Sequence, residues 1–293
     1  MGEVIQAKNE PSVMRKTHSS QTMATASLSS SSSLSLRVNL YSQEMNNSAA
    51  SCIEIGHYSR AIVSLTRALD LYRRQENSRD ITPCNCYRCT LDGCIVHSES
   101  RESPSKNAKV IRKKGDGNSG TTPSGYIYRR PIKVVSQGHP MGPTLNLIIA
   151  FNLGLANQLL LAEVNNNKDE RNKAIRGAIR AYNLTYNMQE SLLQMENSRN
   201  PQVTKAGSSI WSARFQLMVL NNISELYKLN SNVSEYDNCL RRLLSIMMIV
   251  VDQQVRASTT GNNIAPMWRI DMEGFIRNTS ILVLQVECTA ASA

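Results

Sequence analysis

Apolar and polar positions between residues 46 and 76 follow the pattern of two antiparallel helices joined by a tight turn. After the turn, apolar residues recur at three- and four-residue spacing, namely Ala61, Ile62, Leu65, Ala68 and Leu69. This spacing places them on one face of a helix. Gly56 stands at the turn, where a residue without Cβ adopts the left-handed conformation that ends a helix. Such a helix pair leaves an apolar face open, so we expect neighbouring helices to cover it.

Small residues mark the expected crossing of the two helices. Ala49, Ala61 and Ala68 allow the helix axes to approach to about 8–10 Å. The position at which a proline would end the second helix is occupied by Arg73. We therefore expect this helix to continue to about Glu76.

This first pair resembles a tetratricopeptide (TPR) repeat. In that comparison Gly56 is the turn glycine, Tyr58 the aromatic residue after it, Ala61 and Ala68 the small positions and Leu65 the bulky one. The resemblance implies a stack of helix pairs that presents a surface to a peptide or protein, with no chemistry of its own.

Degenerate forms of the same pattern recur twice, followed by a capping helix. The second pair contains Asn152-Leu153-Gly154 and then Ala174, Ala178 and Ala181, with a polar loop expected at residues 164–173; the third contains Asn222-Ile223-Ser224 and Tyr227, then Tyr236, Cys239, Leu243 and Ile246. The capping helix has an apolar face of Met272, Phe275, Ile276, Ile281, Leu282, Leu284 and Val286, with Gly274 inside and the polar Arg277, Asn278 and Gln285 interspersed. The predicted fold is all-α: an irregular TPR-like α-solenoid of about three antiparallel helix pairs plus a C-terminal capping helix.

The whole pattern also resembles a family of uncharacterised TPR-like proteins expanded in diatoms. The similar segments are the first helix pair and residues 128–132, 150–156, 220–223 and 243–247. This resemblance implies a fold, and it brings no activity or binding residue with it.

Composition divides the chain into four parts. Residues 1–40 are rich in serine without helical periodicity and are expected to be disordered. Residues 41–76 form the first helix pair, 77–143 a basic, Cys-containing flexible insert, and 144–293 the remaining pairs and the capping helix. The chain carries a net charge of +10, and nine Lys and Arg against two Asp and Glu lie between Arg101 and Lys133. The interpretations are a solvated loop, an acidic partner, nucleic acid, a nuclear localisation signal at residues 112–114, or an extended stretch at 126–135 along the groove of the solenoid.

A cysteine cluster in the insert is the strongest candidate for metal binding. Its members are Cys84, Cys86, Cys89 and Cys94, with His97 shortly after. Thiolate and imidazole are preferred zinc ligands, but the spacing departs from a zinc knuckle after Cys94. Free thiols are the favoured interpretation, and the other cysteines, Cys52, Cys239 and Cys288, are expected to pack as small apolar residues.

Other motifs do not support a catalytic or cofactor site. Residues 115–120 match Gly-x-Gly-x-x-Gly, but lysines precede them, Pro123 follows, and the acid that binds ribose is missing. The four histidines, His18, His57, His97 and His139, have no nucleophile and orienting acid nearby. The five Asn-x-Ser/Thr sequons, at Asn46, Asn183, Asn222, Asn232 and Asn278, fall mostly in expected helices, so we expect them to pack and not to carry sugars.

These patterns predict a non-catalytic scaffold that presents a helical-repeat surface to a peptide or protein. The alternative is a regulatory protein that binds nucleic acid or zinc through the insert. Stacking aromatics are scarce there, only Tyr126 and Tyr128, which disfavours nucleic acid. We expect no enzyme activity and no cofactor. Polar residues interrupt the longest apolar run, 145–162, which argues against a membrane span, and the absence of a secretory signature predicts a cytoplasmic location.

Overall fold

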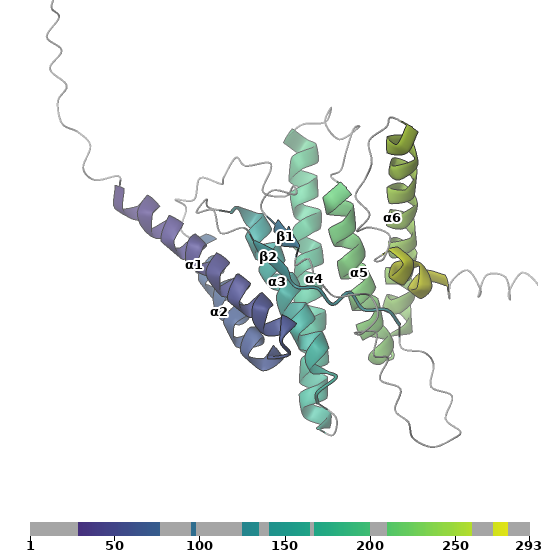
Figure 1. Cartoon of the computed structure of the whole chain (residues 1–293), viewed down its shortest axis with the longest axis horizontal. Helices are drawn as coiled ribbons and strands as arrows, with labels where there is room; N and C mark the ends of the chain where they lie inside the picture. The colour runs from purple at the N-terminus through teal and green to yellow at the C-terminus, as the bar shows by residue number, and fades with distance from the viewer. Residues whose placement is uncertain are drawn as a thin grey trace, which may run out of the picture.

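The computed structural model describes residues 29–76, 95–97, 125–134, 141–164, 167–199, 210–259 and 272–280. The described chain is mostly helical, as predicted (Figure 1). Its helices are α1 (Ser29–Glu54), α2 (Tyr58–Glu76), α3 (Pro143–Leu160), α4 (Lys168–Arg199), α5 (Ile210–Leu229), α6 (Val233–Thr259) and an unlabelled last helix at residues 272–280. Two short strands, β1 (Ile95–His97) and β2 (Ile132–Val134), pair antiparallel, with Val96 opposite Lys133.

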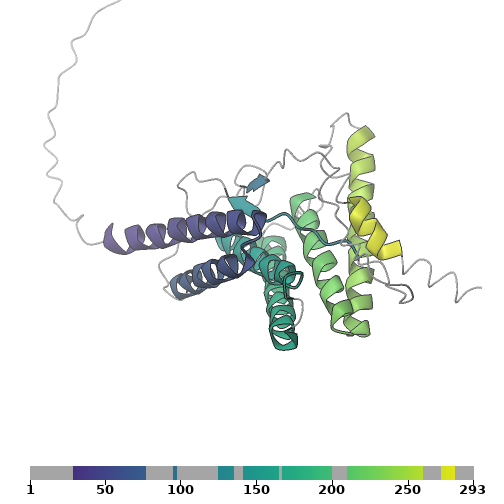
Figure 2. The same ribbon diagram turned by 60° about the horizontal axis from the view of Figure 1, so that its bottom comes forward.

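Helices that are adjacent in sequence make the most extensive contacts. α1 packs on α2, α3 on α4 and α5 on α6, while α2–α3 and α4–α5 contacts link these units (Figures 1 and 2). Ala61, Ala174 and Cys239, which we expected at the crossings, are 0%, 3% and 6% exposed. The prediction that these small side chains face the interior is confirmed.

The turns between the helices are built from conformations and caps that the local sequence favours. Gly56 ends α1 with φ 85°, in the left-handed region where a Cβ would be strained. Asn167 begins α4, because its Oδ1 accepts hydrogen bonds from the backbone N–H groups of Asp169 and Glu170. Asn232 plays the same part at α6 by accepting from the Glu235 N–H.

Three expectations about element boundaries were wrong. Residues 29–40 are helical and belong to α1, where Asn39 is buried and hydrogen-bonded to Met141. α4 starts at Lys168, so the polar loop ends six residues earlier than expected. The insert is not wholly flexible, because residues 125–134 are packed against helices, although residues 77–94, 98–124 and 135–140 lie outside the described part.

The last helix agrees only in part with its predicted pattern. Met272 and Phe275 are buried, but Ile276 is 53% exposed and the polar Asn278 is 2% exposed. Predicted positions beyond residue 280 lie outside the described residues. A search of the described helices found none with the length and apolar character needed to cross a bilayer.

Candidate functional site

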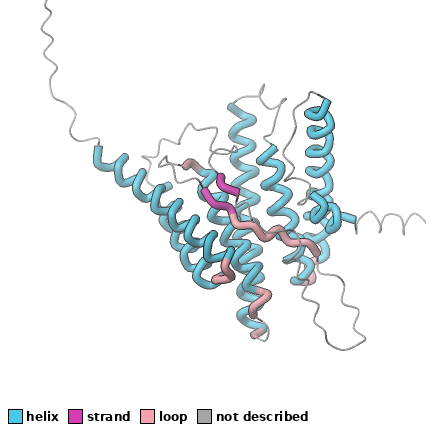
Figure 3. The backbone as a smooth tube through the Cα atoms, in the orientation of Figure 1, coloured by secondary structure: helices cyan, strands magenta, loops and turns pink. Residues whose placement is uncertain are grey.

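An extended segment of the chain crosses one side of the helices. Residues 125–134, which we call the docked segment, run past the last helix, α5, α3 and α1 (Figure 3). The docked segment is part of the insert, and it meets helices up to 152 positions away in sequence. Of the interpretations given for the insert, an extended path along the helices fits residues 126–134.

Five asparagine side chains hold the docked segment and the residue Met141 beyond it. We call them the asparagine row: Asn278, Asn222, Asn152, Asn47 and Asn39. Each Oδ1 accepts a hydrogen bond from one backbone N–H, and each Nδ2 donates a hydrogen bond to the C=O of the same residue. The lengths of these two hydrogen bonds, to N–H first and to C=O second, are 2.8 and 2.8 Å at Tyr126, 2.8 and 2.9 Å at Tyr128, 2.8 and 2.7 Å at Ile132, 2.8 and 2.8 Å at Val134, and 2.9 and 2.7 Å at Met141.

A carboxamide is suited to this task because it carries one acceptor and two donors on a planar group. In an antiparallel sheet, a hydrogen-bonded residue exchanges one N–H and one C=O with its partner strand. Each asparagine offers the same acceptor and donor that such a strand would offer. The asparagine row therefore holds the docked segment through the N–H and C=O groups of its main chain.

Further buried hydrogen bonds fix the side chains of Asn152 and Asn222. Asn152 Nδ2 also donates to Asn46 Oδ1 at 2.9 Å, and Asn46 Nδ2 donates to the Ile132 C=O at 3.1 Å. Asn222 Nδ2 also donates to the Tyr182 hydroxyl at 3.0 Å, which itself donates to Gln158 Oε1 at 2.9 Å. Burial raises the pKa of Tyr182 far above its ordinary value, against a smaller lowering by Asn222, so the hydroxyl stays neutral.

Four side chains of the docked segment are buried, those of Tyr128, Pro131, Ile132 and Val134, whereas Arg129 is exposed. The Tyr128 ring lies 6.2 Å from the ring of Phe151, which also contacts Tyr182 at 5.8 Å and Phe215 at 5.5 Å. Tyr128, Ile132 and Val134 are therefore held both by main-chain bonds of the row and by their buried side chains.

The end of the docked segment at the last helix has its own close contacts. The Tyr126 ring packs edge-on against Phe275 at 5.7 Å. Gly274 makes room for it, because a Cβ at that position would overlap the ring. At Gly125 a Cβ would overlap the carboxylate of Glu225, which accepts a hydrogen bond from the Gly125 N–H.

Glu225 is a buried acid at this same end. Burial raises the pKa of its carboxyl above the ordinary value, against smaller lowering effects of Lys228 and of the bond from Gly125. The acid therefore holds its proton to higher pH in the folded protein than in the unfolded chain.

The sequence carries a local signal for the row that helical periodicity alone does not reveal. Four of its members precede a small residue by two positions, as Asn47-x-Ala49, Asn152-x-Gly154, Asn222-x-Ser224 and Asn278-x-Ser280. Three sequon asparagines, Asn46, Asn222 and Asn278, are 0%, 0% and 2% exposed. Their amides are engaged in hydrogen bonds, which agrees with the expectation that they pack in helices.

Most candidate residues of the insert lie outside the described part, including Cys84, Cys86, Cys89 and Cys94, residues 112–120, and His139. The backbone of His97 pairs with Ile132 between β1 and β2. Of the basic residues, Lys133 forms an ion pair with Glu54 at 2.6 Å. The described residues contain no group of three or more His, Cys, Asp or Glu that could hold a metal.

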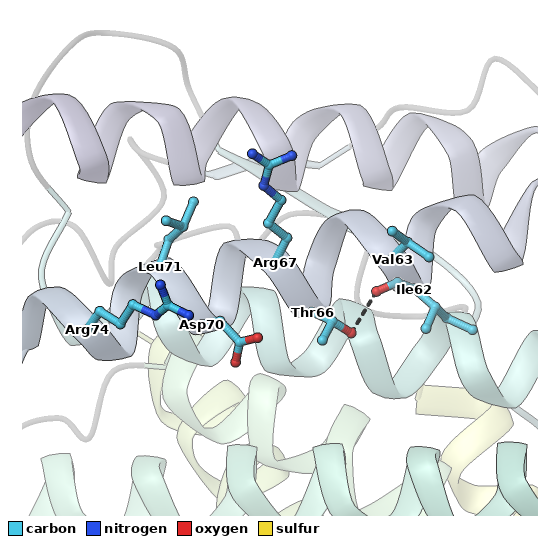
Figure 4. Close-up of a pocket in the computed structure, with 7 residues that line it drawn as sticks. All are labelled: Ile62, Val63, Thr66, Arg67, Asp70, Leu71 and Arg74. Atoms are coloured by element: carbon cyan, nitrogen blue, oxygen red, sulfur yellow. Dashed lines mark hydrogen bonds between the residues drawn. The ribbon is translucent and has the colours of Figure 1, made fainter.

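A depression on α2 is another surface with a defined lining (Figure 4). Its residues all come from one helix: Ile62, Val63, Thr66, Arg67, Asp70, Leu71 and Arg74. Thr66 donates its hydroxyl to the Ile62 C=O of its own helix at 2.8 Å. Arg67, Asp70 and Arg74 are exposed to solvent, so this surface lacks the buried polar groups found along the asparagine row.

Comparisons of the chain with protein-family models, with curated proteins and with solved structures found no match.

Proposed function

We propose that the protein is a non-catalytic interaction scaffold, an irregular TPR-like α-solenoid that binds an extended polypeptide of a partner protein along its asparagine row. One observation carries this proposal: five asparagines, on α1, α3, α5 and the last helix, each bind the N–H and C=O of a single residue. Main-chain bonds of this kind supply affinity for extended peptides wherever a peptide is added to a strand edge.

The arrangement of the helices supports the solenoid part of the proposal. Units of two helices pack in sequence order, with the small side chains of Ala61, Ala174 and Cys239 buried in the core. Four members of the row lie on α1, α3 and α5, the first helix of each unit, and the fifth lies on the last helix. Such a stack forms a continuous surface along which an extended chain meets each unit in turn.

The docked segment occupies this surface, so the test must weaken the packing of the segment against the helices. An Ile132→Ala variant removes a buried side chain, while the hydrogen bonds of the asparagine row are retained. We would select peptides from a random library on the wild-type chain and on this variant. The expected result is enrichment of peptides by the variant, and weaker enrichment by the wild type.

Methylation of single peptide nitrogens provides the decisive readout. The row contacts alternate residues within each half of the docked segment, Tyr126 and Tyr128, then Ile132 and Val134. N-methylation of a selected peptide should therefore abolish binding at alternate positions and leave it nearly unchanged at the positions between. Absence of any selected peptide, or binding that is insensitive to methylation, would refute the proposed function.

A further inference from the structure

The buried side chains of the docked segment indicate which side chains a partner would need. We propose that it occupies the partner's site, and that the partner carries an aromatic residue followed at the fourth and sixth positions by branched aliphatic residues, as Tyr128, Ile132 and Val134 do here. This inference rests on the proposed function and adds the side-chain pattern that the surface selects.

The surroundings of the three side chains define this pattern. Tyr128 lies against Phe151, within a cluster of rings contributed by α3, α4 and α5. Ile132 and Val134 are 2% exposed, and a polar group at either position would be buried without water. By contrast, Arg129 is exposed, so the surface places little demand on that position.

The hydrogen bonds set the register of the pattern. The row binds the main chain at Tyr128, Ile132 and Val134, and the side chains of these three residues are also buried. In an extended chain, a shift by one residue turns the side chains to the opposite face. A partner must therefore present its aromatic and aliphatic residues in the register of the docked segment to satisfy both requirements.

Exchange between the docked segment and a partner is physically reasonable. The favourable terms are eight hydrogen bonds to the row, two at each of Tyr126, Tyr128, Ile132 and Val134, and the buried side chains of the segment. The opposing term is the conformational entropy lost when residues 125–134 become ordered. The segment has the advantage of being tethered, since a short linker raises its effective concentration to about the millimolar range. A partner with the same pattern competes when its affinity or concentration overcomes that advantage.

The test converts the docked segment into a separate ligand within the full chain. Gly/Ser linkers that carry a specific protease site are inserted between Ser119 and Gly120 and between Gln137 and Gly138, and the folded protein is then cut at both. Uptake of a fluorescent peptide with the sequence of residues 122–136 is followed by anisotropy, while circular dichroism reports the helices.

The peptide variants separate pattern recognition from nonspecific uptake. Tyr128→Ala and Ile132→Asp peptides should bind at least tenfold more weakly than the native sequence. An Arg129→Ala peptide is the matched control and should bind within about twofold, because its side chain is exposed. The uncut protein should take up the native peptide much more slowly than the cut protein.

Several results would overturn the inference. The segment would be a structural brace if it leaves the cut protein only when the helices unfold, or if the helices unfold on cutting. If all peptides bind equally, the surface does not select the side-chain pattern. If the segment exchanges only between two copies of this chain, seen as a dimer, a second copy of the chain and not a partner protein occupies the site. If library peptides bind with the alternating methylation pattern but the native peptide does not compete with them, this inference fails while the proposed function stands.

Discussion

Replacement of Asn222 by alanine tests whether the asparagine row stabilises the docked segment. Asn222 is fully buried, and its amide accepts from the Tyr128 N–H at 2.8 Å and donates to the Tyr128 C=O at 2.9 Å. Tyr128 is itself 2% exposed. The Asn222→Ala substitution removes both of these hydrogen bonds from buried main-chain groups.

The expected loss of stability follows from these two groups. A buried polar group that loses its partner costs about 1–3 kcal/mol, so the pair costs about 2–6 kcal/mol. The loss of the bond to the Tyr182 hydroxyl adds to this, while Tyr182 retains its bond to Gln158. Because domains are stable by about 5–15 kcal/mol, the substitution should remove a substantial part of the free energy of unfolding.

Asn157→Ala provides the matched control. Its Nδ2 donates to the Leu153 C=O of its own helix, so its removal orphans no group of the docked segment. Urea denaturation of both variants gives the free energies of unfolding, and hydrogen exchange reports the Tyr128 amide. We expect faster exchange at Tyr128 in Asn222→Ala only. A loss below about 1 kcal/mol, equal to that of the control, would show that the row does not hold the segment.

Three further predictions concern single side chains. Gly274→Ala should lower the melting temperature, because overpacking against the Tyr126 ring costs about 1–3 kcal/mol; Gly142→Ala, with open space around it, should leave the melting temperature nearly unchanged. Burial raises the pKa of the Cys239 thiol to about 12, so mass spectrometry after alkylation at pH 8 should find it unmodified until denaturant is added; rapid native labelling would contradict this. Glu225→Gln should stabilise the protein near neutral pH. Because the pKa of Glu225 is raised in the folded state, wild-type stability decreases as the pH rises from the unfolded-state pKa through the folded-state pKa. Urea midpoints at pH 5 and 7.5 should therefore show a smaller decrease in the variant than in the wild type, and an equal decrease would argue against this effect.

The helices could be predicted because their signals are local. The turn at Gly56, the apolar spacing after it and the small residues at Ala61 and Ala174 all lie within windows of one or two helices. Residues 29–40 were missed because a serine-rich stretch carries little apolar periodicity. Asn39, which is buried and bound to Met141 102 positions away, contributes a long-range hydrogen bond to this part of α1.

The asparagine row could not be derived from the same local signals. Asparagine in a helix is equally consistent with a cap, a solvent-facing residue or a sequon, and its partners here lie between 20 and 152 positions away. Asn278 shows the difficulty. We expected it only as a polar residue interspersed with the apolar face of the last helix, and its side chain is instead 2% exposed. Only the path of the docked segment reveals what these asparagines bind.

The docked segment also changes how the helices depend on one another. In a stack of helices, stability comes mainly from contacts between neighbours, so distant units are coupled weakly. The segment runs from Asn278 on the last helix to Asn47 on α1 and makes main-chain bonds at both. Its bonds therefore join the two ends of the described helical region in addition to the helix–helix contacts. A polypeptide that replaces the segment must span the same helices to maintain this coupling, which favours a partner at least as long as residues 126–134.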